Sequence, residues 1–211
     1  MAQTTTAYPM SLSVDYPDRA LNRLTTFFRA FTIIPILIIL SLIASSSYAG
    51  EAATNWRWEY TAGGLVILPI VLMLLFRQKY PKWWFDWNVA LTKFSTRVSV
   101  YFMLMRDEYP STDEDQAVHI EIPYPDAKEE LNRWLPLVKW FLAIPHYIIL
   151  WFLGIAALVC IVIAWFAILF TGHYPKGLFD FVVGVVRWSL RIDVYAFLLT
   201  TDRYPPFALS D

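Results

Sequence analysis

The sequence has little charge, few glycines and a single cysteine. Of its 211 residues, 17% are Asp, Glu, Lys or Arg, against about a quarter in an ordinary soluble domain. The 17 basic and 18 acidic residues leave a formal net charge of −1, which gives no electrostatic reason to expect binding to nucleic acid. Because Cys160 is the one cysteine, an intrachain disulfide and a thiolate metal site are both excluded.

Apolar and aromatic residues are abundant instead. Hydrophobic residues make up 57% of the chain, aromatic residues make up 18%, and ten residues are Trp. The mean hydropathy is +0.45. This composition excludes an intrinsically disordered chain and is typical of a protein surrounded by lipid. We therefore expect an all-α membrane protein with several membrane-spanning helices.

Three long apolar segments predict these helices, at residues 30–48, 61–77 and 136–171. The first has the length of about 20 residues that crosses a bilayer, and we interpret it as retained rather than as a cleaved signal peptide. The third would rise about 54 Å as one helix, more than a hydrocarbon core of about 30 Å. The sequence therefore predicts transmembrane hairpins of helices 30–48 with 61–77, and 136–153 with 155–171. A turn at Gly154 would close the second hairpin, which either crosses the membrane or re-enters it.

The chain reads as a tandem duplication with units at residues 1–111 and 112–211. Residues 23–35 match residues 133–145, and residues 76–101 match residues 170–195, each without a gap. The first unit carries 16 additional residues between these blocks. Matched spacing over such stretches is typical of an internal repeat.

Each unit opens with alternating apolar residues, which is the period of a half-buried strand. We predict that the two strands pair as a small two-stranded sheet on the cytoplasmic side, with an extended linker as the alternative. The alternating residues are Met10, Leu12, Val14 and Tyr16 in the first unit, and Val118, Ile120, Ile122 and Tyr124 in the second.

Each unit ends in a predicted amphipathic helix, at residues 82–105 and 177–200, with a narrow charged stripe. A spanning helix would place two cations near the midplane, at about 2.5–3.5 kcal/mol each, so we expect both helices to lie in the membrane interface. The stripes are candidate contacts for lipid headgroups or a partner subunit, or they are simply the solvated faces of surface helices. The stripe residues are Asp86, Lys93 and Arg97, and Asp180, Arg187 and Arg191.

Charge distribution favours four crossings with both termini in the cytoplasm. In that topology Arg57 is the only basic residue outside, so 16 of the 17 basic residues lie on the cytoplasmic side, as the positive-inside rule requires. Six crossings would place the two matched basic clusters on opposite sides.

Tyr-Pro occurs seven times. Proline moves the preceding residue out of the helical region, and tyrosine suits the headgroup layer. We interpret these dipeptides as breaks where the chain meets the membrane surface, with a proline-recognition ligand as the alternative.

Residues that carry chemistry are scarce. His146 and His173 are the candidates for a shared haem or metal site if the second hairpin forms, and hydrogen-bonded histidines at helix ends are the simpler interpretation. The sequence contains no nucleophile with a nearby base and no phosphate-binding glycine loop. We therefore expect no cofactor, no metal and no enzymatic activity.

Four segments of the second unit are distinctive: Phe141–His146, Trp165–Gly172, Gly177–Phe181 and Leu198–Phe207. With them, the second unit resembles a bacterial membrane family known as domain of unknown function 4389. The resemblance covers about residues 131–209, and it is looser in the first unit, where Arg77-Gln78-Lys79 replaces Thr171-Gly172-His173. It implies a bacterial integral membrane protein, often with the domain in tandem, and no established activity.

Two functions fit these observations. We expect a non-catalytic accessory or scaffold subunit, or a lipid-organising protein, of the bacterial cytoplasmic membrane. Its partners would be membrane lipids and other membrane proteins, and not nucleic acid. The alternative is a small transporter or channel built around the repeat axis. It needs a polar path, and the predicted spans offer almost no polar residues for one.

Overall fold

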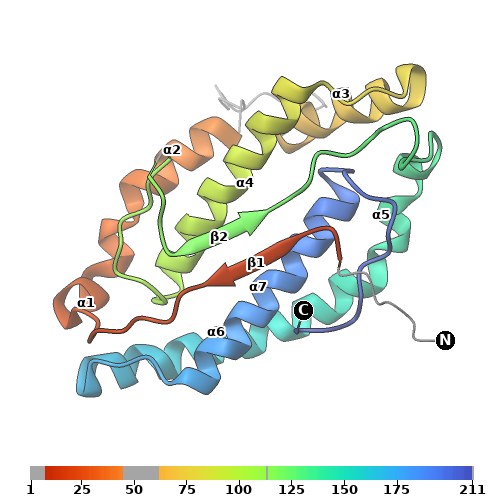
Figure 1. The fold of residues 1–211 in the computed structure, drawn as a ribbon. Helices are drawn as coiled ribbons and strands as arrows, with labels where there is room; N and C mark the ends of the chain where they lie inside the picture. Colours follow the sequence, from red (N-terminus) through yellow and green to blue (C-terminus); the bar gives the residue numbers. More distant parts are fainter. Residues whose placement is uncertain (1–7, 45–61, 113, 211) are drawn as a thin grey trace, which may run out of the picture.

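The fold is mostly helical with one small sheet (Figure 1). A computed structural model describes residues 8–44, 62–112 and 114–210. The elements of the first half are β1 (Ser11–Val14), α1 (Arg23–Thr32), α2 (Ile34–Ala44), α3 (Ala62–Arg77) and α4 (Lys82–Phe102). Those of the second half are β2 (Val118–Glu121), a short 3-10 helix (Leu135–Leu137), α5 (Lys139–Leu142), α6 (Ile144–Thr171) and α7 (Lys176–Ala196).

The predicted two-stranded sheet is confirmed. β1 and β2 pair antiparallel, with Leu12 opposite Ile120 and Val14 opposite Val118. Leu12 and Ile120 are buried, whereas Ser11 and the other outward residues are exposed, as period-two alternation requires. Leu12 thus faces the residue that occupies the same place in the second half of the sequence.

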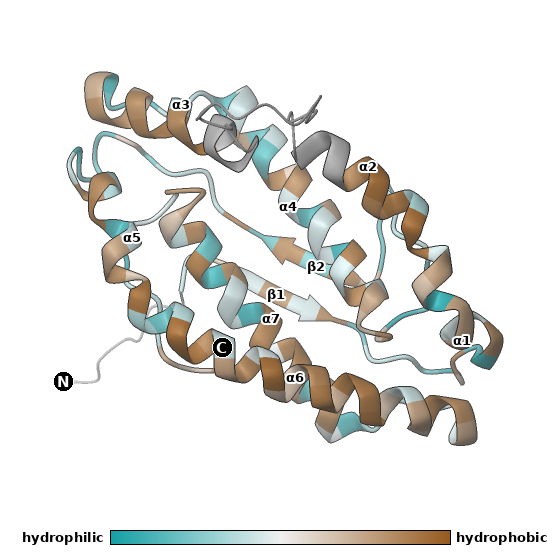
Figure 2. Ribbon diagram, turned by 180° about the vertical axis from the view of Figure 1, so that it is seen from behind, coloured by the Kyte–Doolittle hydropathy of each residue, from teal (hydrophilic) through white to brown (hydrophobic). Residues whose placement is uncertain are grey.

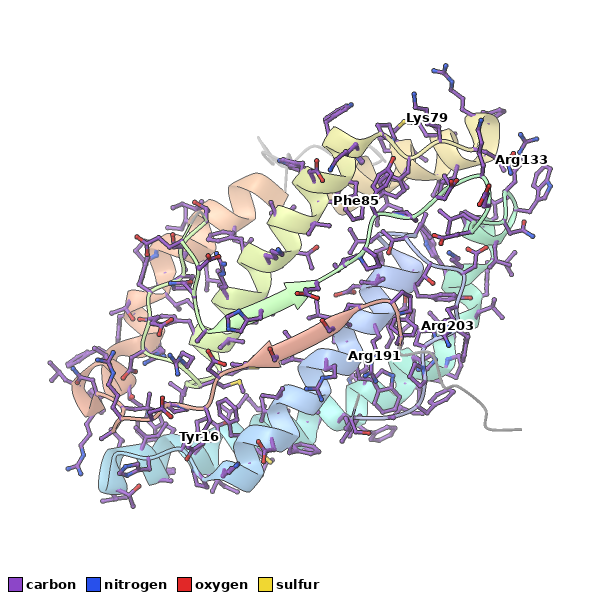
Figure 3. All side chains as sticks on the ribbon, viewed as in Figure 1. Tyr16, Lys79, Phe85, Arg133, Arg191 and Arg203 are labelled. Carbon is purple, nitrogen blue, oxygen red and sulfur yellow. The ribbon has the colours of Figure 1, made fainter. Side chains whose placement is uncertain are left out.

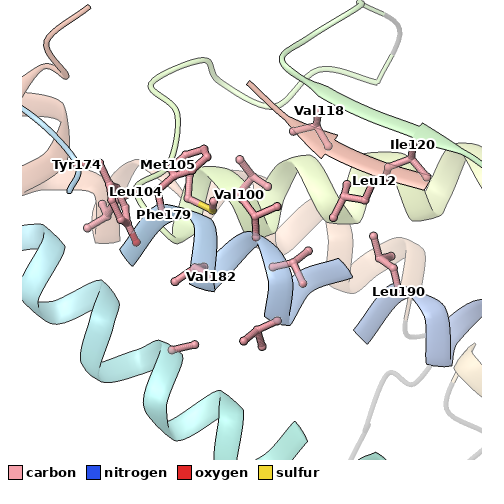
Figure 4. Packing of buried hydrophobic residues seen from close by; sticks show 14 of the residues in the cluster. Leu12, Val100, Leu104, Met105, Val118, Ile120, Tyr174, Phe179, Val182 and Leu190 are labelled. Atoms are coloured by element: carbon pink, nitrogen blue, oxygen red, sulfur yellow. The ribbon is translucent and has the colours of Figure 1, made fainter. Parts of the chain in front are cut away.

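The sheet packs on α4 and α7, and α6 lies beyond α7 as a further layer (Figures 1 and 4). Leu12, Ile120, Val100 and Val182 meet in the main apolar core between these layers. Each such side chain contributes about 1.5–3 kcal/mol when fully buried. α7 is buried along most of its length, so it is the central helix of the molecule.

Both amphipathic helices begin where the sequence predicts them and end a few residues earlier. Instead of reaching residues 105 and 200, α4 ends at Phe102 and α7 ends at Ala196. Leu104 and Leu199 follow with positive φ angles of 63° and 56°. That left-handed backbone conformation cannot continue a right-handed helix.

The predicted turn at Gly154 is wrong, because α6 is one helix of 28 residues. No polar residue near Gly154 offers the backbone an alternative to helical hydrogen bonds, and an interrupted helix in apolar surroundings would leave its carbonyl groups unpaired. The helix instead ends at Gly172, whose φ of 78° gives a left-handed C-cap. This continuity separates His146 and His173 by the length of the helix, about 40 Å at 1.5 Å per residue.

The first half also departs from a side-by-side hairpin. α1 and α2 meet at a bend of 40°, and α3 follows α2 along one edge of the molecule (Figure 1). The segment between the first two predicted helices and the end of the first of them, residues 45–61, lie outside the described residues. Pro35 and Pro145 occupy the second positions of α2 and α6, where a missing N–H costs no hydrogen bond.

Two buried basic residues fix the short helices α1 and α5, which lead into α2 and α6. The guanidinium of Arg29, at the end of α1, pairs with Asp107 and donates to the Tyr101 carbonyl at 2.9 Å. The ammonium of Lys139 pairs with Asp202 at 2.8 Å. Arg29 is 2% exposed and Lys139 is 0% exposed, so both cations depend on these partners for the solvation that they lose.

Two tyrosine hydroxyls form hydrogen bonds between the two halves of the chain. The Tyr16 hydroxyl, after β1, donates to the Tyr174 carbonyl before α7 at 2.5 Å. The Tyr124 hydroxyl, after β2, donates to the Tyr80 carbonyl before α4. All four residues belong to Tyr-Pro dipeptides, so these breaks in the chain also carry the contacts between the halves.

A pair of glycine substitutions tests the continuity of α6. A Cβ atom at Gly154 would meet no atom within 4 Å, so Gly154→Ala should stabilise the helix by up to about 1 kcal/mol and raise the melting temperature in detergent. Gly184→Ala is the control, because its Cβ would lie 2.9 Å from Leu209 Cβ and should lower the melting temperature. Destabilisation by Gly154→Ala would contradict a helix that runs through this position.

Candidate functional site

The cationic stripe of α7 faces the sheet and the C-terminal tail. The Arg187 guanidinium donates to the Leu12 carbonyl of β1 at 3.1 Å. The Arg191 guanidinium donates to the carbonyls of Ala208 at 3.0 Å and Ser210 at 2.8 Å (Figure 3). A two-stranded sheet and an extended tail leave backbone carbonyls without partners, and arginine supplies several donors in a planar fork.

The corresponding stripe of α4 is less covered. Arg97 donates to the Ser111 carbonyl at 2.9 Å, and Lys93 and Glu121 of β2 line the same surface depression. Asp86 forms an exposed ion pair with Lys82 at 3.1 Å. The stripe therefore binds the neighbouring chain segments at one end and remains on the surface at the other.

These positions correct part of the predicted contact set. Asp86 and Asp180 lie on the surface, where a partner or headgroup can reach them. Arg191 is 2% exposed, so the predicted headgroup contact does not hold for this residue. A stripe of this spacing looks the same in sequence whether it faces lipid or the backbone of its own protein.

A cavity of about 590 Å³, the interhelical groove, lies between α4 and α7 on their other faces. Residues of α4 and α7 form its walls, and Leu40 of α2, Ile67 of α3, and Leu150 and Gly154 of α6 line its flanks. At about 100° per residue, the α7 residues that line it lie opposite the side that carries Arg187 and Arg191. The sheet and the groove therefore occupy opposite sides of α4 and α7.

One wall of the groove carries small polar side chains from α4. Each donates a hydrogen bond back to a carbonyl of its own helix, at distances of 2.7 to 3.0 Å. Their oxygen atoms therefore remain available as acceptors toward the groove. These residues are Asn88, Thr92, Ser95, Thr96 and Ser99.

Asp193 lies on the α7 wall and is the one charged residue among the described residues that line the groove. Burial raises the pKa of its carboxyl from 3.8 to about 7, because the charged form loses solvation among apolar neighbours. Burial and, less strongly, the Asp193 charge raise the pKa of Tyr147 on α6. A carboxyl with a raised pKa in a cavity is typical of a functional site.

The sequence contained a signal for this groove, but the charged stripe obscured it. Polar residues at positions 88, 92, 95, 96 and 99 recur at i, i+4, i+7, i+8 and i+11, which defines a second polar face of one helix. Asp193 stands two residues after Arg191, about 200° around α7. The predicted stripe included Arg191 and gave Asp193, on the other side of the helix, no role.

His146 forms a structural cluster rather than a shared site with His173. Trp188 donates to His146 Nδ1 at 3.0 Å, and the ring of Phe207 stacks on the imidazole at a centroid distance of 4.0 Å. His173 lies at the other end of α6, next to Thr171. Among the described residues, no three His, Cys, Asp or Glu side chains lie close enough to share a metal ion.

The environment of Asp193 predicts a pH-dependent effect of Asp193→Asn on stability. The folded-state pKa of about 7 exceeds the ordinary value of 3.8, so the native state holds a proton that the unfolded chain has already lost, and stability falls as pH rises from about 4 to 7. Asn imitates the neutral acid. We expect the melting temperature of Asp193→Asn in detergent to exceed that of the unmodified protein by more at pH 8.5 than at pH 5.5. An equal difference at both pH values would contradict this assignment.

The comparisons with known proteins identify one domain. No curated protein and no solved structure matches the chain. The model of the family described as Domain of unknown function (DUF4389) matches residues 134–208. This range begins just before the 3-10 helix and includes α5, α6, α7 and nearly all of the C-terminal tail. The part of the chain that is similar to the DUF4389 family thus includes the second Arg/Asp helix face and one wall of the interhelical groove.

Proposed function

We propose that this chain is a non-catalytic accessory or scaffold protein of the bacterial cytoplasmic membrane, with membrane lipids and other membrane proteins as its partners. The observation that carries the proposal is α6, which is long and apolar enough to span a membrane and has 17% of its most apolar window buried. Trp151, Phe152 and Phe170 on this helix are 63%, 62% and 78% exposed. Exposed apolar surface of this extent is typical of contact with lipid or protein.

The remaining outer helices support the same environment. Figure 2 shows that the apolar residues of α2 and α6 continue along the outer edges of the molecule, whereas polar residues concentrate in the loops and in parts of the inner helices. The bent pair α1–α2 would be a second span by length and composition. We infer that these helices are the part of the protein that lies in the bilayer.

Contacts at the two ends of α6 bear on topology. At its C-terminal end the Gly172 carbonyl accepts from Leu21 N at 2.8 Å, and just before its N-terminal end the Leu142 carbonyl accepts from the Tyr204 hydroxyl at 3.0 Å. Both ends are thus bonded to segments that flank the sheet side. A perpendicular α6 would bring the sheet to the depth of the hydrocarbon, where open strand edges are unfavourable.

We therefore propose that α6 lies along the bilayer, with the sheet and both termini on the cytoplasmic side. The predicted topology of four crossings relied on the turn at Gly154, which the continuous helix lacks. A topology in which α6 crosses the membrane is the alternative that the labelling experiment below excludes or establishes.

We also infer that the chain arose by tandem duplication. Three observations support this origin: Leu12 faces Ile120 in the sheet, Arg29 and Lys139 are both buried beside an aspartate, and the tyrosine contacts of the two halves are reciprocal. These residue pairs are the ones that the sequence alignment matches.

A transporter or channel around the repeat axis is the second candidate. The interhelical groove favours it, because it supplies at the axis the polar surface that the apolar segments lack. Flux through proteoliposomes that depends on Asp193 would establish this function.

Labelling of single cysteines tests the proposed topology. In a Cys160→Ala background, Glu129→Cys and His173→Cys place thiols before and after α6 at exposed positions. We expect a membrane-impermeant maleimide to label both from the cytoplasmic side, in inside-out vesicles. Labelling of the two positions from opposite sides would show that α6 crosses the membrane.

Co-purification tests the accessory role. Extraction from native membranes in mild detergent should yield this chain together with other membrane proteins in constant proportion. Replacement of exposed apolar residues on α6, as in Phe152→Ala with Phe166→Ala, should release the partners without a change in melting temperature. Recovery of the unmodified chain as a lone monomer would contradict the proposal.

A further inference from the structure

The interhelical groove presents hydrogen-bond acceptors and one carboxylate, and this fixes the chemistry of what fits it. The Thr92 and Ser95 hydroxyl hydrogens point to helix carbonyls, and the Asn88 amide donates to the Trp84 carbonyl at 2.7 Å. The second N–H of Asn88 and the Ser189 hydroxyl are donors on the same lining, but acceptor oxygens outnumber them. Together with the Asp193 carboxylate, these oxygens disfavour carboxylates and phosphates and suit a ligand that donates hydrogen bonds.

The shape and position of the groove indicate a ligand with an apolar chain. Most of its lining is apolar, and its volume of about 590 Å³ lies in the usual range for small-molecule sites, roughly 300–1,000 Å³. Leu40 on one flank and Leu150 on the other belong to the outer helices α2 and α6. The groove is therefore bordered by the helices that the proposed function places in the bilayer, where amphiphiles concentrate.

Asp193 defines the polar end. α4 and α7 run in opposite directions (Figure 1), so Asp193, late in α7, lies toward the same end of the groove as Asn88, early in α4. A cationic headgroup at this end would gain a charge-assisted hydrogen bond to the carboxylate, while its chain extends toward Val185 along the apolar side chains of α7.

We propose that the interhelical groove binds a single-chain amphiphile with an ammonium headgroup, held by Asp193 and the oxygen atoms of α4. The membrane source of the ligand rests on the proposed function, but the site itself requires neither a partner subunit nor a particular topology. Ser189, in the middle of the α7 wall, is a position at which a large side chain would fill the groove.

Photolabelling of the full chain in a bulky neutral detergent tests the site. The probe is dodecylamine with a diazirine in its chain, used at pH 8, and labelled peptides are mapped by mass spectrometry. We expect labels on α4 and α7 that unlabelled dodecylamine displaces and dodecanoate does not. Asp193→Asn should weaken displacement by dodecylamine roughly ten- to hundred-fold, as the loss of a charged hydrogen bond predicts.

Two further variants complete the test. Glu114→Gln removes an exposed carboxylate far from the groove lining and should leave labelling unchanged, and Ser189→Phe should abolish it. Equal displacement by dodecanoate, or undiminished labelling in Ser189→Phe, would overturn the proposal even if Asp193→Asn failed to fold. Because the assay is made in detergent, its failure is distinguishable from failure of the membrane topology or of co-purification.

Discussion

The arrangement of the helices depends on two buried ion pairs. Asp107 and Asp202 each bind a basic side chain from the helix entry of their own half. Each also accepts a backbone N–H, from Asn22 at 2.7 Å and from Asn132 at 2.5 Å. Removing one partner of such a pair leaves an unpaired buried charge, at a cost of about 3–5 kcal/mol. If an outer helix moved away from α4 and α7, it would lose the ion pair, the backbone hydrogen bond to the aspartate and its apolar contacts at the same time.

Sequence periodicity was sufficient to predict the two strands, because alternating apolar residues show which face of a strand is buried. The alternation around Leu12 and Ile120 predicted both strands, and the matched halves predicted which strands would meet. Sequence was insufficient for α6, because hydropathy gives the length of an apolar segment but not the contacts that its two ends make. Those ends are fixed by contacts such as Leu21 with Gly172, which lie about 150 residues apart in the chain and leave no local pattern.

The charged helix faces show a second limit of sequence reasoning. Arg191 and Asp193 are close in sequence, yet one bonds to the C-terminal tail and the other lines the interhelical groove. The unfavourable burial of Asp193 has no compensating bond among the described contacts, which is typical of a residue retained for binding rather than for stability. The groove thus lies where the two halves meet, and neither half contains it alone.

The reciprocal tyrosine contacts make each half of the chain depend on the other. Each strand finds its hydrogen-bonding partner, and each following tyrosine finds its carbonyl, in the other half. The halves relate to each other as two subunits of a dimer do, and the covalent connection between them mainly raises their effective concentration. A polypeptide with only one such half would expose an unpaired strand and an open groove wall, and a second copy of itself would be the natural surface to cover both.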